Sequence, residues 1–236
     1  MRLPVRYAGW MGWDLVRGPG LLMGIVGALA ALLINSLTVV TSGSGGETAV
    51  LLGILDFAVT IFALLATAGM VSTDFSMGYY RPLFARPVSP PLYYLQRWIL
   101  GGVLALVVTA GVGLASALRL GADLPIGRVL VQAALCYLLL GGLVFLLSTV
   151  TRRDWLIAVL IVAAYASLGL ARSLGAAGSG AAALLYAVLP PLRLVDISDP
   201  VPSGGSLLHV LLYGAGLVAA ALGVIRFRPL ARGARE

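Results

Sequence analysis

The stretch VSTDFSMGYYRPLFARPVSPPLYYLQRW, residues 71–98, is the one long internal segment of this 236-residue chain that is polar, charged and aromatic at once. It separates two apolar runs, each long enough to cross a bilayer as a helix. A segment of this kind between two such runs predicts a surface loop that joins two membrane-spanning helices.

Composition indicates an integral membrane protein. Hydrophobic residues make up 60% of the chain and charged residues 11%, and the mean hydropathy is +1.02. A soluble domain of this length needs more charge to solvate its surface. All 16 basic residues are arginine, so the chain has no lysine with which to build a phosphate-binding Walker loop. We therefore expect no enzyme activity in this chain, and any nucleotide must be bound by a partner.

Six apolar runs predict an all-α membrane protein with six transmembrane helices. Their expected ranges are 21–40, 49–72, 99–118, 128–150, 155–170 and 207–225. Residues 2–18 mix arginine with tryptophan and tyrosine, which predicts an interfacial helix lying on the membrane surface. Pro19 and Gly20 are expected to end this helix before the first span begins.

Residues 173–206 do not fit a simple loop before the last span. Residues 181–192 are apolar, but about 12 helical residues cover only about 18 Å, too little to cross a hydrocarbon core of about 30 Å. Pro190 and Pro191 end the run. The segment predicts an external re-entrant hairpin packed against protein, because irregular backbone at membrane depth does not face lipid.

Arginine is distributed unevenly between the two sides of this predicted layout. With the N-terminus inside the cell, twelve arginines lie at cytoplasmic span ends and four on the opposite side. Cytoplasmic loops of membrane proteins carry an excess of basic residues. The bias predicts that both termini and residues 73–97 are cytoplasmic, in a multi-pass protein of a bacterial inner (plasma) membrane.

Within the opening stretch, Asp74 and Gly78 precede RPLFARPVSPPLYYLQRW. The segment resembles the one that ABC-2 type transporter permeases, the six-span transmembrane subunits of type V exporters, write approximately as E-x-x-x-G-T-L-x-x-L-L-x-R-P-V-S-R-x-x-Y-L-x-x-K between their second and third spans. The matching positions are Gly78, Leu83, Arg86, Pro87, Val88 and Ser89, together with Tyr94 and Leu95, which lie one residue further along than the spacing of the pattern places them. The departures are Asp74 for Glu, Tyr79 and Tyr80 for Thr-Leu, Pro82 inside the coupling helix, and Arg97 for Lys. Independently of the resemblance, Ser89 and Pro90 predict the start of a helix that runs into the third span.

The resemblance implies one transmembrane permease domain over residues 1–236, with residues 73–97 as its cytoplasmic coupling segment. Two permease chains, identical or homologous, would pair in the lipid bilayer and dock a dimer of cytosolic ABC ATPase subunits, which would bind the ATP and magnesium; this chain would hold no cofactor. Its function would be to move a substrate across or out of the membrane. The residues implied in coupling to the ATPase are Asp74, Gly78, Tyr80, Arg81, Phe84, Arg86, Pro87 and Ser89.

An alternative function belongs to a different class of protein. The chain could be a non-transporting membrane subunit that transmits ATPase-driven movement to a periplasmic assembly partner. The short external loops argue against a large external machine within this chain, but they are compatible with docking one.

Asp56 is the one carboxylate well inside a predicted span, and the amide side chains of Asn35 and Gln132 lie inside the first and fourth predicted spans. Polar and ionisable residues within a membrane are candidates for function. One interpretation is structural, with Asp56 hydrated near the outer interface or bonded to Asn35. The other is that these residues line a pathway for a polar or amphipathic cargo.

Other classes of protein fit the sequence poorly. The net charge of +7 is explained by arginines at span ends, and the basic face with stacking aromatics that nucleic acid requires is missing. Ser179 lacks the G-x-S-G pattern of an intramembrane serine protease, and His209 is the only histidine. One histidine, one cysteine and scattered carboxylates give no metal-ligand spacing, and Cys136 is expected to be a small core hydrophobe.

Overall fold

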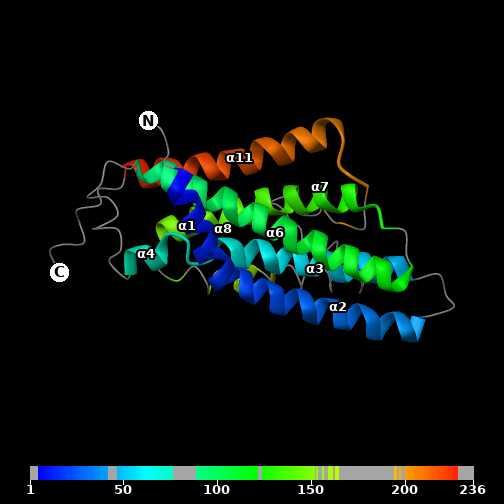
Figure 1. Cartoon of the computed structure of the whole chain (residues 1–236). Coiled ribbons are helices and arrows are strands. Elements are labelled where there is room, and N and C mark those ends of the chain that lie inside the picture. Colours follow the sequence, from blue (N-terminus) through cyan, green and yellow to red (C-terminus); the bar gives the residue numbers. More distant parts are fainter. Residues whose placement is uncertain are drawn as a thin grey trace.

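The computed structural model describes residues 5–41, 47–76, 89–121, 124–151 and 200–227, together with scattered residues between 153 and 197. This part of the chain is helical and contains no strand (Figure 1). The helices are α1 (Val5–Leu15), η1 (Val16–Gly20), α2 (Leu21–Thr41), α3 (Glu47–Thr67), α4 (Ser72–Ser76), α6 (Pro90–Leu120), α7 (Ile126–Cys136), η2 (Tyr137–Gly141), α8 (Gly142–Val150) and α11 (Gly204–Phe227).

Five continuous stretches of the described chain are long and apolar enough to cross a membrane. They are Gly9–Ile34, Leu51–Asp74, Pro90–Leu120, Ile126–Val150 and Gly204–Phe227. The chain is therefore an all-helical, multi-pass membrane protein, as its composition predicts. The expected span over 155–170 and the expected re-entrant segment 173–206 lie largely outside the described residues.

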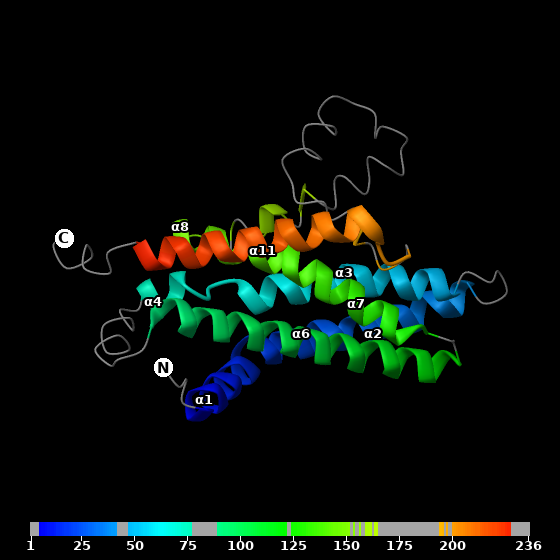
Figure 2. The same ribbon diagram turned by 90° about the horizontal axis from the view of Figure 1, so that it is seen from above.

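The long helices run side by side along one axis (Figures 1 and 2). The α3 stretch and the α7–η2–α8 stretch are the most buried, while α2 and α11 flank the bundle with most of their surface exposed. Leucine and isoleucine side chains cover the exposed faces of these two helices. Apolar faces of this size on the outside of a bundle are expected where lipid is the solvent.

Helix α1 continues into α2, contrary to the sequence prediction that Pro19 and Gly20 end it. The backbone passes through a π-type turn, η1, with Pro19 inside. Proline cannot donate a hydrogen bond, and the extra residue of a π turn accommodates this missing donor while bending the helix. Helix α1 therefore leaves α2 at an angle (Figure 2) and packs against α6, where Met11 and Leu15 are buried.

Helix α6 begins where the sequence predicts. Ser89 occupies the N-cap position with extended backbone, and the prolines follow at the first two helical positions. The Ser89 hydroxyl makes no capping hydrogen bond. The 31 residues of α6 cover about 46 Å, more than the hydrocarbon core, so one end of α6 extends beyond it. The helix stops at Gly121, whose φ of 63° lies in the left-handed region and whose N–H bonds to Ala117 O.

The second predicted span, 49–72, is interrupted near its end. Helix α3 stops at Thr67, and a turn that contains Gly69 at φ 74° leads into the short helix α4. Helices α1 and α4, the start of α6 and the end of α11 all lie at the same end of the bundle, on the left in Figure 1. This end is called the α4 end below.

Candidate functional site

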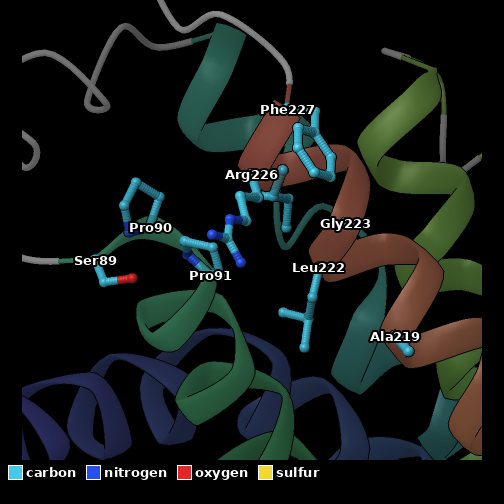
Figure 3. Close-up of a pocket in the computed structure, with 9 residues that line it drawn as sticks. Ser89, Pro90, Pro91, Ala219, Leu222, Gly223, Arg226 and Phe227 are labelled. Carbon is cyan, nitrogen blue, oxygen red and sulfur yellow. The ribbon is translucent and has the colours of Figure 1, made fainter.

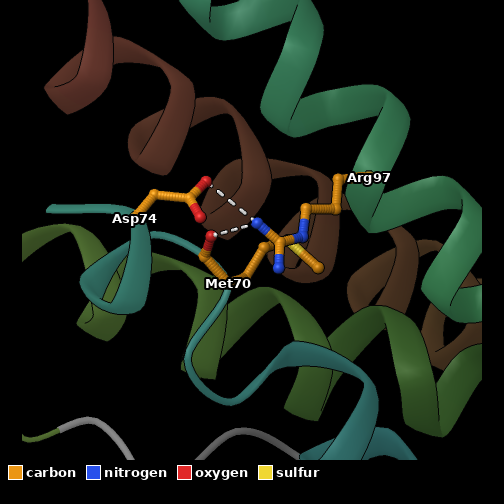
Figure 4. A network of polar contacts seen from close by, with 3 residues as sticks. All are labelled: Met70, Asp74 and Arg97. Atoms are coloured by element: carbon orange, nitrogen blue, oxygen red, sulfur yellow. Dashed lines mark hydrogen bonds and ion pairs between the residues drawn. The ribbon is translucent and has the colours of Figure 1, made fainter. Parts of the chain in front are cut away.

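An ion pair at the α4 end joins the two sides of the stretch with which the sequence analysis began. Arg97, in the second turn of α6, donates from Nη1 to Asp74 Oδ2 at 2.9 Å. The same nitrogen donates to the carbonyl oxygen of Met70 at 3.1 Å. Figure 4 shows the guanidinium between the α3–α4 turn and α4. One arginine thus holds both the turn and the helix that follows it.

The surroundings of this pair exclude most water. The side chains of Arg97 and Asp74 are 19% and 10% exposed. Tyr93 and Tyr94, one turn before Arg97, are buried with their rings edge to face at 5.1 Å. Met11 of α1 packs in the same hydrophobic cluster as Met70 and these two tyrosines. Three elements, α1, α4 and α6, therefore meet around one shielded cation.

The structure describes two of the residues assigned to coupling. Asp74 is buried and bonded within the chain, and Ser89 lies at the start of α6. The remaining residues, Gly78, Tyr80, Arg81, Phe84, Arg86 and Pro87, lie outside the described residues. Because Arg97 bonds to Asp74, the chain on either side of residues 75–88 is held at one place on the α4 end.

Sequence reasoning missed Arg97 as a site residue and noted it only as a departure from the family pattern. The available signal was its charge, opposite to that of Asp74, at the other end of the same polar segment. Ionisable residues at membrane depth tend to pair with one another or with backbone carbonyl groups.

A second polar site lies between α3 and α7, among the predicted intramembrane residues. The backbone N–H of Ile197 donates to Asp56 Oδ1 at 3.1 Å. Arg128 donates from Nη2 to the carbonyl oxygen of the same Ile197, also at 3.1 Å. Ile197 is fully buried. Asp56 and Arg128 thus satisfy both backbone groups of a residue just before the last span, where an unpaired polar group would be costly.

Gln132 lies on α7 beside this second polar site. Arg128, Gln132 and Cys136 are spaced by four residues, so they share one face of α7. Gln132 is fully buried, and Cys136 is buried as well.

The expected partner of Asp56 was Asn35, whose side chain lies outside the described residues. In the described part of the chain, Asp56 instead accepts a hydrogen bond from the backbone N–H of Ile197, which is a structural contact.

A cleft of about 680 Å³ opens at the α4 end between the start of α6 and the end of α11 (Figure 3). It is lined by Ser89, Pro90, Pro91, Ala219, Leu222, Gly223, Ile225, Arg226 and Phe227. The side chains that line it are apolar except for those of Ser89 and Arg226. No sequence pattern singled out this place, because it forms from segments more than 100 residues apart.

No protein-family model matches the chain, and no curated protein matches it.

Proposed function

We propose that this chain is the membrane permease subunit of an ABC-2 type transporter, which moves its substrate with the energy of ATP hydrolysed by a separate cytosolic subunit. Residues 73–97 are its coupling segment. The chain itself binds no nucleotide, and it works paired with a second permease chain.

The ion pair between Asp74 and Arg97 is the observation that supports this proposal most directly. These two residues stand where the family pattern has Glu and Lys, and they are both departures from it. The side chain of Asp is one methylene shorter than that of Glu, and the guanidinium of Arg reaches further than the ammonium of Lys. The two departures therefore compensate each other in length, and the observed distance of 2.9 Å is that of a charge-assisted hydrogen bond.

The pair also suggests how movement would pass into the membrane. Arg97 is part of the longest helix, α6, and it bonds to the turn and to the helix that continue from α3. A displacement of α4 would move α3 and α6 together, because Arg97 bonds α6 to both the α3–α4 turn and α4. Rigid-body movement of packed helices is an established way to couple distant sites.

The test is co-purification with an ATPase and stimulation of its activity. The tagged chain is purified from its native membrane, and an ABC-type ATPase with a Walker motif is expected to come with it. Replacing Phe84 and Arg86 together by Ala is expected to lower the recovered ATPase at least tenfold. The ATPase activity should fall to that of the isolated ATPase subunit, because aromatic and Arg side chains dominate interface energetics.

A matched control changes the same residue types where no docking is proposed. Phe57 is 54% exposed on α3, and Arg119 is exposed near the end of α6 opposite to the α4 end. The double variant Phe57→Ala/Arg119→Ala is expected to keep the ATPase bound. The proposal is refuted if no ABC-type ATPase accompanies the wild-type chain, or if the Phe84 and Arg86 variant retains ATPase and stimulation at the control level.

A further inference from the structure

The cleft at the α4 end carries one charged side chain. Arg226 is exposed, and its guanidinium extends across the cleft toward Pro91 (Figure 3). Its carbon Cζ lies 5.9 Å from the centre of the Phe227 ring. The ion pair of Arg97 with Asp74 does not involve Arg226, and no carboxylate in the part of the chain that the structure describes pairs with Arg226. The cleft thus presents a cation that is available to an anionic ligand.

The apolar wall of the cleft belongs to a longer stripe on α11. Ala219, Leu222 and Arg226 are spaced as i, i+3 and i+7, so they share one helix face. The stripe continues toward the other end of the bundle through Leu208, Leu212 and Ala215, all of which are exposed. A ligand with a charged head in the cleft could therefore lay an apolar tail along α11.

We propose that this cleft binds an anionic glycerophospholipid, with its phosphate on Arg226 and an acyl chain along the exposed stripe of α11. Basic pockets between transmembrane helices bind anionic headgroups in this way. An acidic segment of a protein partner would also complement Arg226, but it would leave the apolar stripe uncovered. The proposal does not depend on the proposed transport function.

Gly223 provides a second way to test the site. A Cβ atom at Gly223 would meet no atom within 4 Å, so a larger side chain enters the cleft without displacing backbone. The variant Gly223→Leu fills the cleft and leaves Arg226 in place. The variant Arg226→Gln removes the charge and leaves the cleft open.

The experiment counts retained lipids by native mass spectrometry. The chain is reconstituted in bilayers of equal parts phosphatidylglycerol and phosphatidylcholine and released in mild detergent. The wild-type chain is expected to retain phosphatidylglycerol over phosphatidylcholine by at least fivefold. Each of the variants Arg226→Gln and Gly223→Leu should lose most of this preference.

Two controls match the two variants. Arg119→Gln removes an exposed arginine at the opposite end of the bundle, and Gly111→Leu adds bulk at an exposed glycine of α6 with open space around it. Both are expected to keep the wild-type preference, and thermal unfolding verifies that all four variants are folded.

Equal retention of the two lipids by the wild-type chain would overturn the proposal, as would an unchanged preference in Arg226→Gln or in Gly223→Leu. Loss of ATPase co-purification in Arg226→Gln, without any lipid preference in the wild-type chain, would assign the cleft to a protein partner and also overturn it.

Discussion

Arg97 illustrates how much one residue can determine in a membrane protein. Its guanidinium is mostly shielded from water and bonds to the carboxylate of Asp74 and to the carbonyl oxygen of Met70. Shielded pairs contribute little net stability compared with apolar residues of the same size, but removing one partner leaves the other charge uncompensated. The cost of a single substitution is therefore expected to exceed the cost of removing both charges.

We expect Arg97→Met to lower the free energy of unfolding by about 3 kcal/mol, the lower end of the range for breaking a buried ion pair. The double variant Asp74→Asn/Arg97→Met should recover a substantial part of this loss. Thermal unfolding in detergent, followed by circular dichroism, measures the four corners of the cycle.

The matched control is Arg119→Met, since Arg119 is an exposed arginine on the same helix; it should change stability by less than about 0.5 kcal/mol. Strictly additive effects of Asp74→Asn and Arg97→Met would contradict the coupling between them.

At the residue scale, sequence reasoning found the polar residues more easily than their partners. Asp56 and Gln132 are conspicuous because charged and amide side chains are rare inside apolar runs. The N–H that Asp56 accepts comes from Ile197, 141 residues further along the chain. Such a pairing depends on how the helices pack, and neither spacing nor periodicity encodes it.

At the scale of the elements, close helix contacts depend on particular glycines. A Cβ atom on Gly214 of α11 would lie 2.5 Å from Leu138 Cγ and 3.2 Å from Leu138 O, so α11 and η2 are in contact at their backbones there. Lipid provides no hydrophobic drive for helices to associate, and small residues that permit close packing take its place.

Gly214→Ala is therefore expected to destabilise the chain by about 1–3 kcal/mol, as overpacking does. Gly216→Ala serves as its control two residues away, because a Cβ atom on Gly216 meets nothing within 4 Å and Ala favours helix over Gly. Thermal unfolding of both variants provides the comparison, and a Gly214→Ala variant as stable as Gly216→Ala would contradict the close contact.

Element positions were predicted better than element continuity. The start of α6 was anticipated because the N-cap position and proline at the first helical position are local signals. The break between α3 and α4 and the continuity through η1 were not anticipated. Both features depend on how a turn packs against neighbouring helices. A short stretch of sequence carries no information about this packing.

On the scale of the whole molecule, the uneven distribution of arginine between the two ends of the predicted spans predicts how the chain is oriented in the membrane. The positions of two serines at opposite ends of the bundle allow this orientation to be tested. Ser89 lies at the α4 end, whereas Ser203 immediately precedes α11 at the opposite end. The single natural cysteine, Cys136, is buried, so Cys136→Ala provides a background without reactive thiols.

In that background we expect Ser203→Cys to react with a membrane-impermeant maleimide in intact cells. Ser89→Cys should react only after the membrane is permeabilised, because arginine-rich ends remain in the cytoplasm. The opposite labelling pattern would contradict this orientation and would indicate that residues 71–98 lie outside the cell.

The uninterrupted helical backbone from α1 through η1 to α2 has a mechanical consequence. A Cβ atom on Gly20, at the bend, would lie 3.0 Å from Leu15 O and 3.2 Å from Leu104 Cδ2, so the bend rests directly on α6. The two helices therefore form one bent, continuous unit, and the bend between them is in contact with α6. Since no flexible linker separates the two helices, tilting α1 would swing α2, and the single proline-containing turn between them would set how far α2 moves for a given tilt of α1.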